Sequence, residues 1–219
     1  TIWDFRTNSK IALEIIYDRY GLSEYYPLFD EYYRVYSEKN TELWSLYHHN
    51  RISKETLIVE RFRYPLQRVG AYNDKLVLQL NADYLSVLSE QGELVPQARE
   101  LLDYLKSRSY RLHIISNGFK EVQFKKMKSA GIESYFEKII LSDEVGVNKP
   151  HPDIFRYALN KTGSSKNTSL MIGDNYDADI LGAMRSGLDQ VYFNPLQKQI
   201  SDEFPTYEVQ TLSEICDIL

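Results

Sequence analysis

The stretch SLMIGDNYDADILGA (169–183) decides the fold, because a short apolar run in it ends at a glycine and gives way to acidic residues. The run LMI (170–172) is typical of a buried strand, and Asp174, Asp177 and Asp179 follow it. Clustered carboxylates repel one another and lose hydration at the end of a buried strand. A hard cation such as Mg²⁺ would offset this cost, because it prefers oxygen ligands.

The same design recurs along the chain from residue 96 onward. Apolar runs that are typical of strands lie in 110–118, 136–150, 169–174 and 189–195. Amphipathic stretches that are typical of helices lie in 96–107, 119–130, 151–162 and 176–186. Continuously apolar strands that alternate with helices favour a parallel sheet with both faces covered. We therefore predict an α/β fold with a doubly wound parallel sheet.

Residues 10–90 have a different pattern. Four segments show helical spacing of their apolar residues, with breaks near Gly21, Asn50 and Gly70, and no short buried strand is evident. We predict that 10–90 form a helical domain inserted into an α/β domain made of 1–9 and 91–219.

Composition excludes several classes of function. The 219 residues have a net charge of −5 and no lysine- or arginine-rich block, so we expect no binding to a nucleic acid polymer. No apolar run approaches the roughly 20 residues that cross a bilayer, and the start TIWDFRTNSK (1–10) does not resemble a signal peptide. The single cysteine, Cys216, fits a reducing compartment. We predict a cytoplasmic protein with no membrane partner.

Polar groups follow three of the predicted strands: Ser116 and Asn117, then Lys149, then Asp174 with Asp179. Ligands of open α/β sheets bind beyond the carboxyl ends of the strands, so we expect these groups to lie at one edge. A hydroxyl, an amide and a lysine bind phosphate oxygens, and carboxylates bind Mg²⁺. The sequence therefore predicts a Mg²⁺-phosphate site.

Each group also has a simpler interpretation. Ser-Asn-Gly (116–118) is a common turn, and a lysine before a proline, as at Lys149, is more often a solvated surface residue. Asp177 and Asp179 could favour the positive N-terminal end of the next helix, and we assign Asp177 to that role. Asp174 has no such explanation, because it directly follows the glycine that ends a strand.

Together these motifs resemble the haloacid dehalogenase (HAD) superfamily over nearly the whole chain. HIISNG (113–118) resembles its second motif, with Ser116 as the phosphate-binding hydroxyl. VGVNKP (145–150) resembles the third, with Lys149 as the lysine, and GDNYDADI (173–180) the fourth. There the resemblance makes Asp174 a metal ligand and Asp179 its acidic partner. The order of segments is similar to that of the YjjG-like pyrimidine 5′-nucleotidases, which carry an inserted helical cap.

The first motif of that family, D-x-D-x-T, is represented only by its closing threonine, Thr1. The nucleophilic aspartate and the acid/base aspartate would both precede Thr1, together with the central strand of the sheet. Asp4 cannot replace them, because it lies on the wrong side of the threonine. A parallel sheet without its middle strand would leave backbone groups unpaired, so we expect this strand upstream of Thr1.

The resemblance implies a Mg²⁺-dependent phosphomonoester hydrolase that acts through an aspartyl-phosphate on a small phosphorylated metabolite, with nucleoside 5′-monophosphates preferred. Thr1, Ser116 and Lys149 would bind the phosphoryl group, and Asp179 would orient Lys149 or the metal shell. Asn117 and Gly118 would join Ser116 in binding the substrate.

Trp3 and Asp4 would lie near the leaving group, where the chain enters the cap.

Two alternative functions stay open. One is a 2-haloacid dehalogenase, although its chemistry needs no metal and leaves Asp174 and Asp179 without a purpose. The other is a non-catalytic phosphate-binding module, which fits a chain without the nucleophile.

Overall fold

In the computed structural model, residues 1–200 and 203–219 are described, and their contacts divide them into two compact units. One unit is Thr1–Asp4 with Glu93–Leu219, and the other is Phe5–Gly92. No helix in the described part of the chain combines the length and the apolar character needed to cross a membrane.

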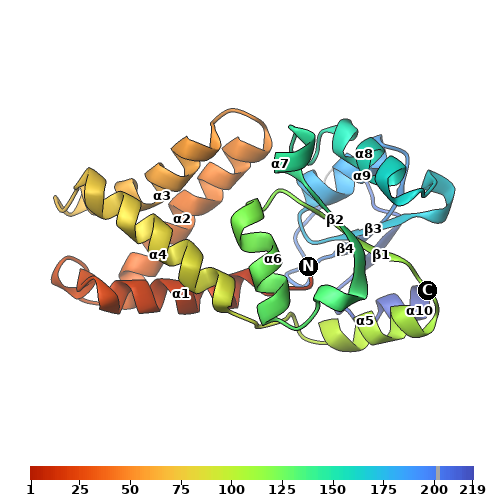
Figure 1. The fold of residues 1–219 in the computed structure, drawn as a ribbon, viewed down its shortest axis with the longest axis horizontal. Coiled ribbons are helices and arrows are strands. Elements are labelled where there is room, and N and C mark those ends of the chain that lie inside the picture. The colour runs from red at the N-terminus through yellow and green to blue at the C-terminus, as the bar shows by residue number, and fades with distance from the viewer. Residues whose placement is uncertain (201–202) are drawn as a thin grey trace. The chain divides into compact units, whose positions relative to one another are not determined.

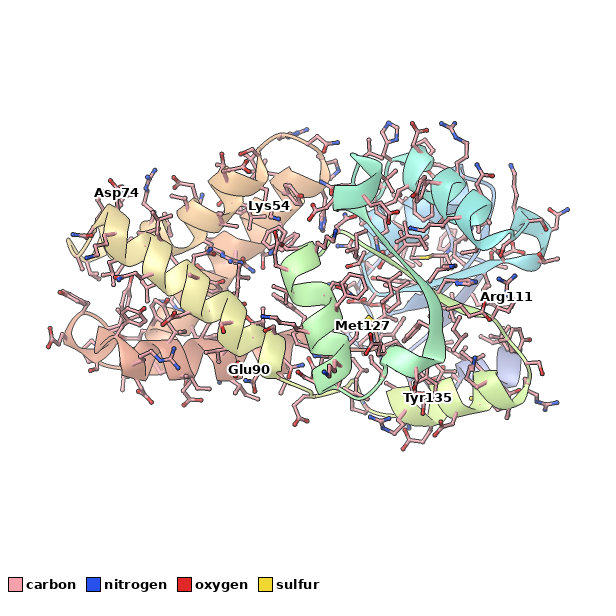
Figure 2. All side chains as sticks on the ribbon, in the orientation of Figure 1. Lys54, Asp74, Glu90, Arg111, Met127 and Tyr135 are labelled. Atoms are coloured by element: carbon pink, nitrogen blue, oxygen red, sulfur yellow. The ribbon has the colours of Figure 1, made fainter. Side chains whose placement is uncertain are left out.

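The unit Phe5–Gly92 is helical (Figure 1). Its elements are α1 (Phe5–Arg19), the short 3₁₀ helix η1 (Leu22–Glu24), α2 (Phe29–His48), α3 (Lys54–Arg68) and α4 (Asp74–Glu90). Side-chain caps fix where the last two helices begin, because the Ser53 hydroxyl and the Asn73 amide oxygen accept hydrogen bonds from backbone N–H groups of the first turn. Lys54, Asp74 and Glu90 mark ends of α3 and α4 in Figure 2.

Aromatic rings fill the interior of this helical unit. Tyr36, Phe62 and Tyr84 are fully buried, with ring centroids 5.1 Å apart for Tyr36 and Phe62 and 5.5 Å apart for Phe62 and Tyr84. Arg61 is buried beside them, donates to the Asn81 amide oxygen, and lies 5.0 Å from the centroid of the Tyr84 ring. The buried Arg61 is therefore engaged in the packing of this unit.

The described residues of the second unit form five strands in two parallel sheets. β1 (Leu112–Ser116) pairs with β2 (Phe136–Leu141), and β3 (Leu170–Gly173) pairs with β4 (Asp189–Phe193), which pairs with β5 (Tyr207–Val209). The four strands predicted from the sequence are confirmed. β5 was not predicted, because only the last of its three residues is buried.

Helices cover both faces of these strands (Figure 1). One apolar cluster joins α5 (Ala98–Ser107) and α10 (Ile215–Ile218) to β4 and β5, and another joins α8 (Pro152–Thr162) and α9 (Gly182–Arg185) to β2. The remaining elements are α6 (Lys120–Ser129), η2 (Glu133–Tyr135), α7 (Ser142–Val145), η3 (Lys166–Thr168) and the π-helix η4 (Tyr176–Leu181). The α/β class with helices on both faces of a parallel sheet is confirmed.

The predicted single sheet is present as two halves. β1 has β2 as its one strand partner and β3 has β4, within the described residues. A cavity of about 910 Å³ is lined by every residue of β1 and by Leu170, Met171 and Ile172 of β3. Side chains of β1 are only half-buried as a result. The difference from the prediction arises because no strand of the described chain pairs with the open edges of β1 and β3.

Candidate active site

The turn after β1 holds Ser116, Asn117 and Gly118. The Ser116 hydroxyl accepts a hydrogen bond from the Gly118 backbone N–H at 3.0 Å and donates to the Gln123 side chain at 3.2 Å. Asn117 is buried, and its amide exchanges two hydrogen bonds, of 2.9 and 2.8 Å, with the backbone of Lys149. Asn117 therefore ties the loop after β1 to the loop that carries Lys149.

Lys149 is buried rather than solvated, so the simpler interpretation of this residue is wrong. Only 9% of it is exposed, and its ammonium donates to the Ile115 carbonyl at 2.8 Å and to Asp179 Oδ1 at 2.6 Å. A buried lysine needs such partners, because an uncompensated charge in the interior is costly. The pair fixes the lysine ammonium at the carboxyl end of β1.

Asp179 reaches Lys149 from the π-helix η4, a rare helix type that often occurs at functional sites. The wide turn is visible in its hydrogen bonds, because the Ile180 N–H contacts the Asn175 carbonyl, five residues earlier, at 3.4 Å. The second carboxylate oxygen of Asp179 accepts from the Asn175 N–H at 3.1 Å. A Cβ on Gly173 would lie 2.3 Å from the Asp179 Cβ, so this close approach requires glycine before Asp174.

Asp174 follows β3 directly, and its side chain is half exposed. Its Oδ1 accepts a hydrogen bond from the Thr1 hydroxyl at 2.7 Å. Burial acts to raise the pKa of Asp174, whereas the hydrogen bond from the Thr1 hydroxyl and the charge of Lys149 act to lower it. A carboxylate must be ionised to bind a metal ion, and these two groups favour the ionised form of Asp174.

The donor set fits Mg²⁺ in part. Asp174 offers one half-exposed carboxylate beside a cavity, whereas Asp179 is committed to Lys149. Among residues 1–200 and 203–219, no group of three or more His, Cys, Asp or Glu side chains could hold a metal ion. Mg²⁺ needs no such cage, because it usually keeps several waters and takes one or two carboxylates and a substrate phosphate. Asp174 therefore fits as one ligand of such an ion.

Most of the residues predicted for the site line the cavity between β1 and β3. Those that line it are Thr1, Trp3, Ser116, Lys149, Asp174 and Asp179. Asn117, Gly118 and Asp4 do not line it; the Asp4 backbone N–H donates to the Glu93 carbonyl at 3.0 Å. The strand ends that are far apart in sequence are therefore brought together, as the topology requires.

Two side chains of this cavity were missed by sequence reasoning, Gln123 and Lys126 of α6. Gln123 is buried against the Ser116 hydroxyl, and the Lys126 ammonium lies 4.8 Å from the centroid of the Trp3 ring. Their three-residue spacing places them on one face of the helix that follows Ser-Asn-Gly. This spacing was the feature of the sequence from which both residues could have been predicted to face the site.

Residues 1–187 match the family described as "Hydrolase: haloacid dehalogenase-like hydrolase", and the chain belongs to this family. The pyrimidine 5′-nucleotidase YjjG of Escherichia coli (strain K12) is 30% identical over 191 residues, which span 86% of this chain and 83% of YjjG. The crystal structure of the HAD-hydrolase YfnB from Bacillus subtilis, bound to magnesium, has a TM-score of 0.90 at 29% identity, covering 100% of this chain and 93% of that chain.

The L-2-haloacid dehalogenase from Xanthobacter autotrophicus matches with a TM-score of 0.75 at 18% identity, covering 100% of this chain and 94% of that chain. This likeness shows a shared fold. The resemblance to the HAD superfamily, and within it to the YjjG-like nucleotidases, is confirmed. The chain is accordingly a hydrolase of the HAD class.

Proposed function

We propose that this protein is a Mg²⁺-dependent phosphomonoester hydrolase. The observation that carries the proposal is the buried Lys149–Asp179 ion pair at the end of β1, beside the Ser116 hydroxyl. An ammonium held in this way offers a fixed positive charge to an anion in the cavity, and fixed charges stabilise phosphoryl transfer without reorganising.

Each remaining group of the site has a role in this proposal. Ser116 and Lys149 bind oxygens of the phosphoryl group, and Thr1 joins them with its hydroxyl. Asn117 is a positioning residue, because both of its amide atoms are engaged by the Lys149 backbone. Gly118 contributes its backbone, which bonds to the Ser116 hydroxyl. Asp179 orients Lys149 through the 2.6 Å contact.

Asp174 is the proposed Mg²⁺ ligand of this chain. The cation, when bound, would shield the anionic substrate from an attacking carboxylate. Support comes from the half-exposed Asp174 carboxylate beside the cavity and from the likeness to YfnB, whose crystal structure is described as bound to magnesium.

The nucleophile is proposed to lie upstream of Thr1, on a strand that occupies the cavity between β1 and β3. Both strands line this cavity, and among the described residues each of them pairs with one strand only. An aspartate there would attack phosphorus and form an aspartyl-phosphate. A second aspartate would protonate the leaving alcohol and then activate water. Intact-mass analysis of the native protein tests whether these residues exist.

Nucleoside 5′-monophosphates are the proposed substrates, in a cytoplasmic enzyme. The relationship to YjjG, a pyrimidine 5′-nucleotidase, supports this choice. We further propose that residues 10–90 act as a cap over the core 1–9 and 91–219, and that Trp3 and Asp4 contact the leaving group. A cap of this kind excludes water and admits only small substrates.

The experiment that tests the function is a steady-state comparison of the full-length protein on nucleoside 5′-monophosphates, sugar phosphates and 2-haloacids. We expect nucleotides to give the largest kcat/KM, with pyrimidines ahead of purines. Sugar phosphates ranking first would reject the nucleotidase and keep the phosphatase. Halide release as the fastest reaction would support the dehalogenase, and no turnover at all would support a non-catalytic module.

A further inference from the structure

Lys126 is a second lysine at the cavity, and it differs from Lys149 in its partners. The Lys149 ammonium is paired with the Asp179 carboxylate. Among the described residues, the Lys126 ammonium forms no ion pair and no hydrogen bond, and it lies 4.8 Å from the centroid of the Trp3 ring. A cation over an indole face is stabilised by the ring, but it keeps its full charge and its hydrogen-bond donors.

The Lys126 ammonium is close to the turn that carries Ser116. A Cβ on Gly118 would lie 3.0 Å from the Ser116 hydroxyl oxygen, 3.1 Å from Gln123 Oε1 and 3.9 Å from Lys126 Nζ. These three side-chain groups therefore surround Gly118. Figure 2 labels the neighbouring residue Met127, which is buried and anchors this part of α6. The position of the ammonium is thus set by a helix that packs through Met127.

The electrostatic environment of Lys126 is positive. Burial, and after it the charge of Lys149, lower the pKa of Lys126 to about 8. The charge of Lys149 is thus near enough to disfavour the charged form of Lys126, and an anion bound between the two ammonium groups would relieve this repulsion.

We propose that Lys126 binds the phosphate group of the substrate, together with Ser116, and is a specificity residue for phosphomonoesters. This inference rests on the proposed function and deepens it. A lysine gives a compact charge with three donors, which suits a phosphate dianion. Lys149 already shares its charge with Asp179, so Lys126 adds the second positive charge that distinguishes a phosphate dianion from a singly charged carboxylate.

The test compares Lys126→Gln, Lys126→Arg and Lys125→Gln in the full-length enzyme, with inorganic phosphate as the probe. Lys125 is the matched control, because it is an exposed lysine of the same helix. We expect Lys126→Gln to raise both KM and the inhibition constant of phosphate at least about tenfold, because hydrogen bonds to charged groups contribute that much. Lys126→Arg should restore most of the affinity, and Lys125→Gln should leave both constants unchanged.

The inference would be overturned if KM and the inhibition constant of phosphate for Lys126→Gln stayed within about twofold of the wild-type values. It would also be overturned if Lys125→Gln raised both constants as much as Lys126→Gln. Thermal unfolding shows whether each variant is folded. If Lys126→Gln is not folded, Lys126→Met takes its place, because methionine keeps an apolar side chain over the Trp3 ring. A wild-type enzyme with no phosphatase activity refutes the proposed function. Activity with an unaltered Lys126→Gln variant refutes only the role of Lys126.

Discussion

The two units of this protein bury polar groups in different surroundings, one in a packed interior and the other beside a cavity. In the helical unit, Arg61 and Tyr84 are satisfied by Asn81 and Ser9 inside a packed aromatic interior. In the α/β unit, Lys149 and Asp179 are also buried and paired, but both line a cavity together with the half-exposed Asp174. Buried charge therefore indicates a candidate site where it lines a cavity, and not where packed side chains enclose it.

The largest effect is expected from Asp174. Asp174→Ala in the full-length enzyme should lower kcat about a thousandfold, since a metal that stabilises the transition state contributes several kcal/mol. Chelation by EDTA should abolish wild-type activity, and added Mg²⁺ should restore it. Asp177→Ala is the control, because Asp177 is assigned only to the helix that follows, and it should retain activity. Phosphatase activity that survives EDTA would remove Asp174 from the metal site.

A smaller effect, on stability, is expected at the Lys149–Asp179 pair. A lysine before a proline is more often a solvated surface residue, but the structure buries Lys149 against Asp179. Lys149→Ala should therefore lower the free energy of unfolding by about 3 kcal/mol, because it leaves a buried carboxylate unpaired.

Denaturant unfolding of the double variant Lys149→Ala/Asp179→Ala separates the two roles of the pair. The double variant should recover most of the lost stability, because neither charge is then buried alone, and it should stay inactive. A double variant as unstable as Lys149→Ala would show that packing, rather than charge, dominates at this pair.

The smallest effect on the free energy of unfolding is expected in the helical unit, where two buried tyrosines, Tyr84 and Tyr32, can be compared. The Tyr84 hydroxyl shares a 2.9 Å hydrogen bond with Ser9, whereas the Tyr32 hydroxyl has no partner among the described residues. Tyr84→Phe should cost about 1 kcal/mol in denaturant unfolding, and Tyr32→Phe should cost nothing or stabilise slightly. Equal costs would mean that the Ser9 hydrogen bond does not distinguish the two hydroxyls.

The sequence predicted the strands and their ends because those features are local. Continuous apolar runs that stop at Ser116 and at Gly173 place polar residues at the sheet edge without any knowledge of tertiary contacts. The contact of Asn117 with Lys149 spans 32 residues, so no local pattern could reveal it. Lys126 was missed for a related reason, because a helical lysine over a ring looks the same in sequence as one in solvent.

The wide turn of η4 limits which insertions and deletions this segment tolerates. Removing one residue between 176 and 178 would let the π-helix relax to ordinary α-helical spacing, which is the more stable form of backbone. The same deletion would shorten the segment between Asn175 and Asp179 by one residue. Asp179 could then no longer contact both Lys149 and the Asn175 N–H, as it does now. A shortened loop would thus be easier to fold and would lose the carboxylate that orients the lysine.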